Sequence, residues 1–130
     1  MQRSLTLTTN PIDEPVLVAG RVRSADLGAV VTFTGVVRGR ESEAYIGGLE
    51  YEAFTPMVER QFALLFDELE RRWPVESVRL VHRLGVVRVS EASLWIEVIA
   101  PHRGEAFAAG QWLIDEMKRV VPIWKKVLPA

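Results

Sequence analysis

Two long segments of helical periodicity, each ended by a proline, most constrain how this chain can fold. The first is expected to begin with Thr55 as N-cap and Pro56 as the first helical residue, and to end at Pro74. The second is expected to begin near residues 103–105 and to end at about Val121, where Pro122 stops it. Both helices carry an apolar stripe that must pack on another layer. The stripes are Val58, Phe62, Leu65, Leu69 and Trp73 in the first helix and Ala106, Gly110, Leu113, Met117 and Val120 in the second.

The remaining segments have the composition of strands and turns. Residues 29–38 (AVVTFTGVVR) are β-branched and aromatic, which is typical of a strand. The polar, glycine-flanked residues 39–48 are expected to form a mobile loop and residues 15–24 a short helix, while residues 123–128 are too short to assign beyond a candidate strand. Further strands are expected at residues 4–8, 49–54, 78–84, 86–89 and 94–100. This order predicts one α+β domain over residues 1–130, with the helices packed on a mainly antiparallel sheet.

Composition excludes several classes of protein. A chain of 130 residues with 48% hydrophobic and 25% charged residues suits one globular domain rather than a disordered chain. The net charge of −1 argues against a nucleic-acid binder, which needs a basic excess. Without cysteine, a disulfide, a thiol nucleophile and a thiolate metal site are all impossible, and two histidines argue against a zinc site.

No segment of the sequence has the pattern of a membrane span or a secretory signal. The longest apolar runs are far shorter than the roughly 20 residues that cross a bilayer, and the first residues lack an apolar stretch. We therefore expect a cytoplasmic protein with no membrane partner. The common nucleotide, metalloprotease and serine-hydrolase motifs are missing as well, so no metal or cofactor is expected.

Several cations stand in apolar or turn-forming segments. Arg38 ends an apolar strand, five positions after Phe33, so the two side chains would face opposite sides of a regular strand. A bulge at Gly35 would bring both to one pocket. The alternative is that Arg38 is a solvated strand end. His82 and Arg83 are expected to be a core or interface histidine beside a surface arginine.

The second helix has cations at both ends. His102 and Arg103 stand at its start, where the helix dipole disfavours positive charge, and a bound anion would explain them. Lys118 is one residue beyond Met117 of the apolar stripe, and Lys125 follows shortly after. Lysines beside apolar walls and other cations suit proton transfer or covalent work. The alternatives are an exposed turn and ordinary lysines at a helix C-terminus.

Taken together, four segments resemble the large, catalytic subunit of molybdopterin synthase. These segments are VTFTGVVR, LEYEAF, HRLG and APHRGEAFAAGQWLIDEMKRVVPIWKK, and the resemblance extends over about residues 29–126. It implies an α/β-hammerhead fold. It also implies conversion of cyclic pyranopterin monophosphate (precursor Z) into molybdopterin by insertion of two sulfurs. The sulfurs arrive as a thiocarboxylate on the Gly-Gly tail of a small ubiquitin-like subunit, and the large subunit forms a homodimer within a heterotetramer.

The resemblance also implies roles for individual residues. Lys118 and Lys125 match the two active-site lysines of the family, and Arg38 matches its strand-end arginine. By this match, Lys118 serves in acid–base or transient covalent chemistry, Lys125 orients the substrate or neutralises developing charge, and the cations hold the phosphate. Family members continue with a further arginine, so the resemblance implies either a pocket that lacks one cation or a substitute such as Arg40. Phe33 and Ile114 match positions that line the pocket, while His102 and Arg103 match a pair that reaches into the neighbouring subunit's pocket.

A second reading of the same residues needs no chemistry. A non-catalytic dimeric module that binds a ubiquitin-like tail or an anionic metabolite would explain the fold and a basic pocket. It would not explain the two lysines and the His-Arg pair together. Nucleic-acid binding is disfavoured by the net charge.

Overall fold

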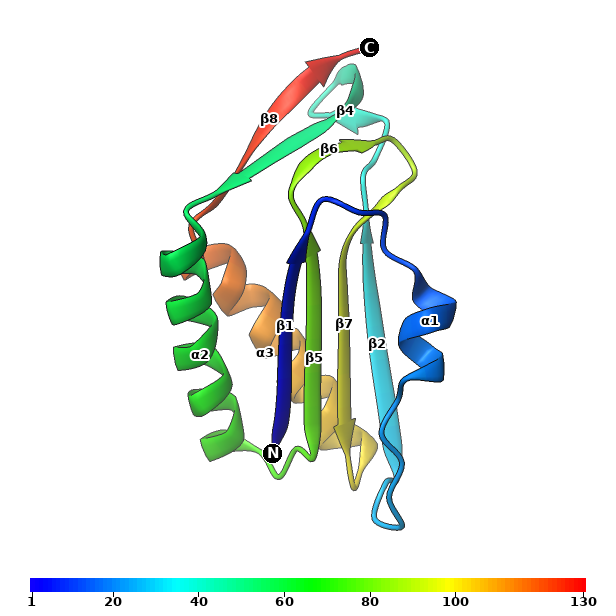
Figure 1. Ribbon diagram of the computed structural model, residues 1–130, viewed down its shortest axis with the longest axis vertical. Coiled ribbons are helices and arrows are strands. Elements are labelled where there is room, and N and C mark those ends of the chain that lie inside the picture. Colours follow the sequence, from blue (N-terminus) through cyan, green and yellow to red (C-terminus); the bar gives the residue numbers. More distant parts are fainter.

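The computed structural model describes residues 1–130, and its largest element is a four-stranded sheet (Figure 1). The strand order is β1-β5-β7-β2, formed by β1 (Gln2–Thr8), β5 (Ser77–Arg83), β7 (Ala92–Ala100) and β2 (Ala29–Val36). β1 runs parallel to β5, and the other two pairs are antiparallel. The prediction of an α+β fold with a mainly antiparallel sheet is confirmed.

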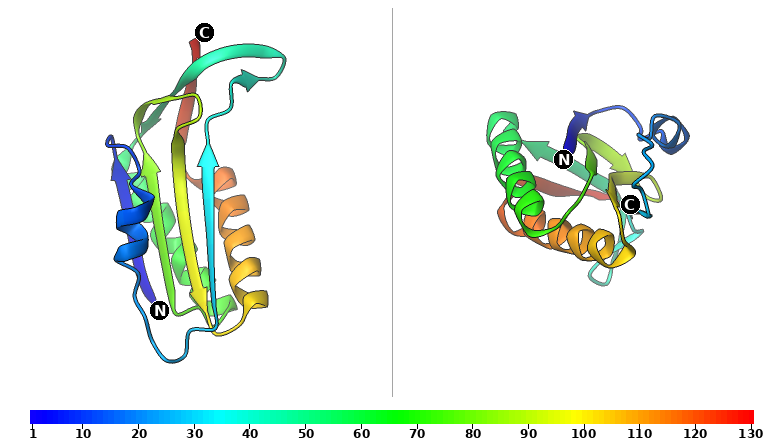
Figure 2. Two further views of the ribbon diagram at one scale, coloured as in Figure 1. Left: turned by 90° about the vertical axis from the view of Figure 1, so that its right-hand side faces the viewer. Right: turned by 90° about the horizontal axis from the view of Figure 1, so that it is seen from below.

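The two long helices cover one face of this sheet. Figure 2 shows α2 (Thr55–Arg72) and α3 (Arg103–Val120) together on one side and the short α1 (Glu14–Ala19) on the other. Both predicted stripes point inward and join a core of sixteen buried residues, in which Phe62, Leu69 and Leu113 are fully buried. Neither helix, nor α1, is long and apolar enough to span a membrane.

On the sheet face opposite the long helices, ion pairs attach other parts of the chain to the sheet. Glu97 on β7 is completely buried and accepts hydrogen bonds from Arg79 (2.8 and 2.9 Å) and from Arg21 (2.7 Å). Arg79 also donates to the backbone oxygen of Leu17 in α1, at 2.8 Å. Burial raises the pKa of Glu97, but the hydrogen bonds from the two arginines outweigh it, so the pKa lies below its usual value. These contacts attach α1 and the chain after it to the sheet.

A smaller sheet crosses one end of the large one (Figure 1). It contains β3 (Arg40–Glu41), β4 (Ala44–Ala53) and β6 (Gly85–Arg88), with β8 (Ile123–Pro129) on the other edge of β4. Its core has only four buried residues, Val37, Ile46, Leu49 and Val87. The candidate strand at residues 123–128 is therefore confirmed as β8.

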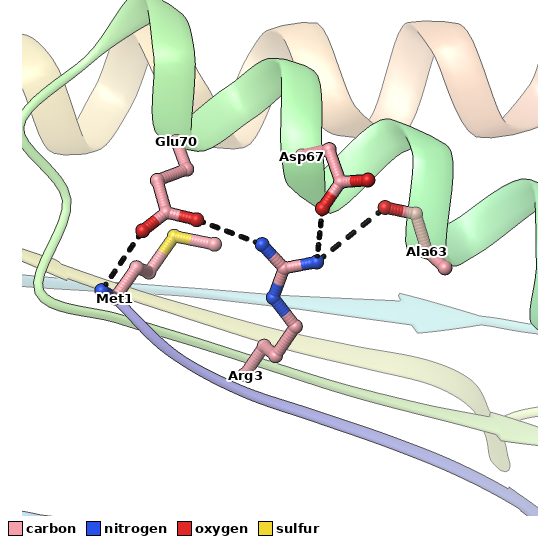
Figure 3. Close-up of polar contacts among 5 residues, drawn as sticks. All are labelled: Met1, Arg3, Ala63, Asp67 and Glu70. Carbon is pink, nitrogen blue, oxygen red and sulfur yellow. Dashed lines mark hydrogen bonds and ion pairs between the residues drawn. The ribbon is translucent and has the colours of Figure 1, made fainter.

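Ionic contacts fasten the start of the chain to α2 (Figure 3). Arg3 on β1 reaches Asp67 at 2.7 Å and Glu70 at 2.8 Å, and the amino group of Met1 contacts Glu70 at 3.1 Å. Hydrogen bonds from that amino group and from Arg3 lower the pKa of the Glu70 carboxyl. The edge strand β1 is thus attached to a helix as well as to β5.

Three local expectations are wrong. Residues 39–48 are not a free loop, because β3 pairs with the start of β4 in a tight hairpin in which Ser42 has φ of 57°. Thr55 is not an N-cap: α2 begins at Thr55, and the residue before it, Phe54, makes no side-chain cap hydrogen bond. The first helix ends at Ala19 rather than at residue 24, with Gly20 as its C-cap.

Candidate active site

The largest hollow lies where the two sheets meet. It is a cavity of about 580 Å³ with apolar walls that include Phe33, Leu94 and Met117. Three cations line it: Arg38 follows β2, Lys118 lies on α3 and Lys125 lies on β8. Arg38 is thus brought to the same cavity as Lys118 and Lys125, which lie about eighty residues later in the sequence.

Phe33 and Arg38 line the same cavity, beside a register irregularity between β2 and β7. Gly35 pairs with Leu94 of β7, but the register shifts before Val36, so one residue of β7 is skipped. A Cβ at Gly35 would stand 3.3 Å from the Cβ of Leu94, which leaves little room for a side chain at this approach. The predicted irregularity at Gly35 is present, but its extra residue, Ser93, lies on β7 rather than on β2. The side chains of Phe33 and Arg38 nevertheless both line the cavity.

The two lysines differ in how they are held. Lys118 lies in the last turn of α3, next to Met117 of the large core. Lys125 lies on β8, and its Nζ stands 3.2 Å from Oε1 of Glu41 on β3. Glu41 also lines the cavity, and it was not predicted from the sequence. Its only signal there was a carboxylate in the polar GRES segment that follows Arg38.

His82 forms part of the cavity wall, although the sequence indicated only a core or interface histidine. Its Nδ1 lies 2.6 Å from the backbone oxygen of Arg83, and its ring meets Tyr51 edge to face at 5.0 Å. Burial lowers the pKa of His82, although its hydrogen bond to the Arg83 carbonyl acts in the opposite direction.

Arg83 is buried, so the expectation of a surface arginine is wrong. Its guanidinium donates to the backbone oxygen of Val86 at 3.3 Å and to Glu91 at 3.4 Å, while its Nε has no partner. These contacts connect the end of β5 with the β6–β7 turn, which supports the smaller sheet beside the cavity.

Comparison with known proteins identifies the family. The model of the MoaE protein family matches residues 7–120. The chain belongs to the MoaE family. The molybdopterin synthase catalytic subunit of Staphylococcus carnosus is 46% identical over 99 residues, which are 76% of this chain and 66% of that relative. The chain thus matches about two thirds of the length of this relative, and the family expected from the sequence is confirmed.

Solved structures show the same MoaE fold. Molybdopterin synthase from Staphylococcus aureus superposes with a TM-score of 0.87 at 35% identity, over 96% of this chain and 90% of that one. A complex of subunits 1 and 2 of molybdopterin-converting factor from Helicobacter pylori superposes with a TM-score of 0.77 over 97% of this chain and 89% of that one. At 21% identity, the second comparison concerns the fold alone.

Not all the expected residues meet in this MoaE chain's cavity. Ile114 lies outside it and lines a separate hollow of about 210 Å³ between β2 and α3, which Phe33 also borders. Arg40 stacks on Tyr45, with its guanidinium carbon 4.5 Å from the ring centroid, and is not part of the cavity lining. Neither residue contributes to the cavity within one chain.

His102 and Arg103 lie at the far end of α3. At a rise of about 1.5 Å per residue, the helix separates Arg103 from Lys118 by roughly 22 Å. The pair borders a different, shallow hollow with Gly28 and Pro101, and the exposed His102 ring contacts Glu105 at 3.4 Å. Within one chain this pair cannot reach the cavity. No group of three or more His, Asp or Glu side chains is placed to hold a metal ion.

Proposed function

We propose that this chain is the catalytic subunit of a molybdopterin synthase. Its reaction is the insertion of two sulfurs into cyclic pyranopterin monophosphate, with the thiocarboxylate of a small ubiquitin-like subunit as the sulfur donor. The observation that carries this proposal is the meeting of Arg38, Lys118 and Lys125 around one cavity in a chain of the MoaE family. Both reactants are anions, and a cavity with three cations favours both.

The position of each cation supports a separate role. Arg38 follows β2 and can bind a phosphate with two parallel hydrogen bonds. Lys118 stands beside the apolar side chain of Met117, where an amine can transfer a proton or form a transient covalent bond at the reacting carbons. Lys125 is paired with Glu41 and supplies charge to orient the substrate. Phe33 forms an apolar wall against the ring system.

The partners are a second copy of the chain and two small subunits, which together form a heterotetramer. In such a dimer, His102 and Arg103 of one copy complete the cavity of the other. Their exposure and their distance from the cavity of their own chain support this arrangement. The cytoplasmic location and a role for Ile114 at the pocket stay predictions.

Reconstitution tests the function. The purified chain is mixed with thiocarboxylated small subunit and precursor Z, and molybdopterin is measured. We expect product only when all three components are present, and no product with small subunit that carries an ordinary carboxylate. Binding of both partners without any product would instead identify the non-catalytic module.

Mixed dimers test the sharing of the site. A subunit with Lys118→Ala is combined with a subunit that carries His102→Ala and Arg103→Ala. If residues of two copies form each site, the mixture regains one working cavity per dimer, although each variant alone is inactive. No recovery in a verified mixed dimer would refute sharing.

A further inference from the structure

His82 is an ionisable side chain in the cavity for which the proposed reaction has no role so far. It lies on β5, is only 5% exposed, and faces the same cavity as Lys118 and Lys125. The neighbouring ring of Tyr51 packs against it at an interplanar angle of 77°. Packing therefore holds the imidazole in one orientation at the wall of the cavity.

The hydrogen bond of the ring determines its tautomer. A carbonyl oxygen only accepts hydrogen bonds, so the contact of 2.6 Å to the Arg83 oxygen requires the proton to be on Nδ1. Nε2 then carries a lone pair. Nε2 forms no hydrogen bond within the protein, and it is not among the fully buried polar atoms that lack a partner. The protein thus leaves an acceptor at the cavity wall.

Most other polar side chains that line the cavity are donors or are already paired. Arg38 and Lys118 can only donate, and Lys125 is bonded to the carboxylate of Glu41. The hydroxyl of Thr34 donates to Glu14 at 2.8 Å. A substrate that carries hydrogen-bond donors as well as a phosphate needs an acceptor, and His82 provides one.

We propose that Nε2 of His82 accepts a hydrogen bond from an N–H or O–H group of the bound heterocyclic substrate. The cations then bind the phosphate of the substrate, while His82 selects the orientation of its ring system. This inference rests on the proposed function. The lowered pKa of His82 supports it, because a neutral ring keeps the lone pair that an imidazolium would lose.

Two variants separate the two ring nitrogens. His82→Asn places an amide near the position of Nδ1, so it keeps the donor to the Arg83 oxygen and loses the acceptor in the cavity. His82→Gln places an amide near the position of Nε2, so it keeps a cavity acceptor and loses the anchor to Arg83. A merely structural role would make Gln the more harmful change, whereas substrate recognition makes Asn the more harmful one.

The measurements are KM for precursor Z, kcat and the melting temperature of the reconstituted enzyme. We expect His82→Asn to raise KM about tenfold, the effect of one lost hydrogen bond with its buried partner left unsatisfied, with kcat within about twofold of the parent. His82→Gln should keep KM within about threefold although it melts at a lower temperature. In ¹⁵N-labelled protein, precursor Z alone should shift the Nε2 resonance more than the Nδ1 resonance.

The outcomes distinguish this inference from the function on which it rests. If the parent enzyme forms no molybdopterin, the proposed function fails, and the inference fails with it. If the parent turns over and His82→Asn has the parent's KM, the inference alone is refuted. A KM that rises more in His82→Gln than in His82→Asn would also refute it, as would an unshifted Nε2 resonance at saturating precursor Z.

Discussion

The two sheets of this molecule are built in opposite ways. In the large sheet, β7 is buried along all but its first residue, and sixteen side chains form one core with α2 and α3. In the small sheet, four buried residues form the core, and large apolar side chains remain exposed, with Tyr45 at 70% and Trp124 at 58%. The large sheet packs into the main core of the domain, and the small sheet is a thinly packed layer that crosses the end of the large one.

This difference bears directly on the cavity, because one lysine lies on a helix that packs on the large sheet and the other lies on a strand of the small sheet. Lys118 belongs to α3 and follows Met117 of the large core, so its backbone is held by the best-packed part of the molecule. Lys125 belongs to β8, where few buried apolar contacts oppose local opening. A rigidly placed lysine suits proton transfer or bond formation, and an adjustable one suits charge neutralisation.

The strongest test of this comparison is to replace each lysine by arginine. Lys118→Arg keeps the charge but not a group that can give up a proton, so we expect turnover to fall by about 10²- to 10⁴-fold. Lys125→Arg should lose about tenfold or less, because charge is retained. The measurement is molybdopterin formed per small subunit consumed, with dimer size and thermal melting as folding controls. Near-parental turnover in Lys118→Arg would restrict Lys118 to binding the phosphate.

Substitutions in the large core should lower the free energy of unfolding more than substitutions in the small core. Phe62→Ala removes a fully buried ring from the large core and should cost about 3–5 kcal/mol. Val87→Ala removes two buried carbons from the small core and should cost about 1.5 kcal/mol. Urea unfolding measures both changes. Because Val98 is almost as fully buried as Val87 but lies in the large core, Val98→Ala is the matched control and should cost more than Val87→Ala. Equal costs would show that the two cores are equally packed.

The large sheet was more predictable from the sequence than the small one, for a physical reason. The stripes of α2 and α3 repeat within one segment, so periodicity reveals them without knowledge of their partners. The irregularity at Gly35 was also expected from the alternation of side chains along one strand, although its extra residue lies on β7. The β3–β4 hairpin has the polar, glycine-containing composition of a loop, and the rest of β4 pairs with β6 and β8, which are distant in the sequence.

Only those site residues that stand in a local pattern could be predicted from the sequence. Arg38, Lys118 and Lys125 were noticeable as cations beside apolar stripes, and the structure brings them to one cavity. The role of Glu41 depends on its contact with Lys125, which no local pattern contains. His82 similarly looked like a core residue, because its pattern is that of a buried strand and the cavity exists only in the folded chain.

The charged face of the large sheet provides a pH test. Because the pKa of Glu97 is lowered in the folded state, its stabilisation is complete above its unfolded pKa and is lost as the pH falls through the folded value. Glu97→Gln should cost about 3 kcal/mol at pH 7, since it leaves two arginines without their carboxylate. The difference between parent and variant should shrink toward about pH 3. Urea unfolding at both pH values measures this change. A difference that is independent of pH would contradict the ionic role.

The surface provides the control for this test. Glu68 forms ion pairs with Arg71 and Arg72, and hydrogen bonds from these arginines lower its pKa to about 2. Its contacts are exposed to solvent, so Glu68→Gln should change stability far less than Glu97→Gln at pH 7. A loss as large as that of Glu97→Gln would show that burial is not what makes the Glu97 contacts important.

The smallest expected effect concerns the Glu41–Lys125 contact in the small sheet. The Glu41–Lys125 pair is partly exposed, with 34% and 51% of the two side chains accessible, so Glu41→Gln should change stability by less than about 1 kcal/mol. The same change removes a negative charge from the cavity and frees Lys125, so precursor Z should bind about two- to fivefold more tightly. This gain should diminish at high salt, because the pair is accessible to counterions.

Calorimetric titration at low and high ionic strength measures the effect. Glu43→Gln is the matched control, because Glu43 lies in the same hairpin but forms no ion pair and does not line the cavity. If Glu41→Gln weakened binding instead, the pair would serve to hold Lys125 in place rather than to compete with the substrate. Lys125 would then be as firmly positioned as Lys118, and the contrast between the two lysines would not hold.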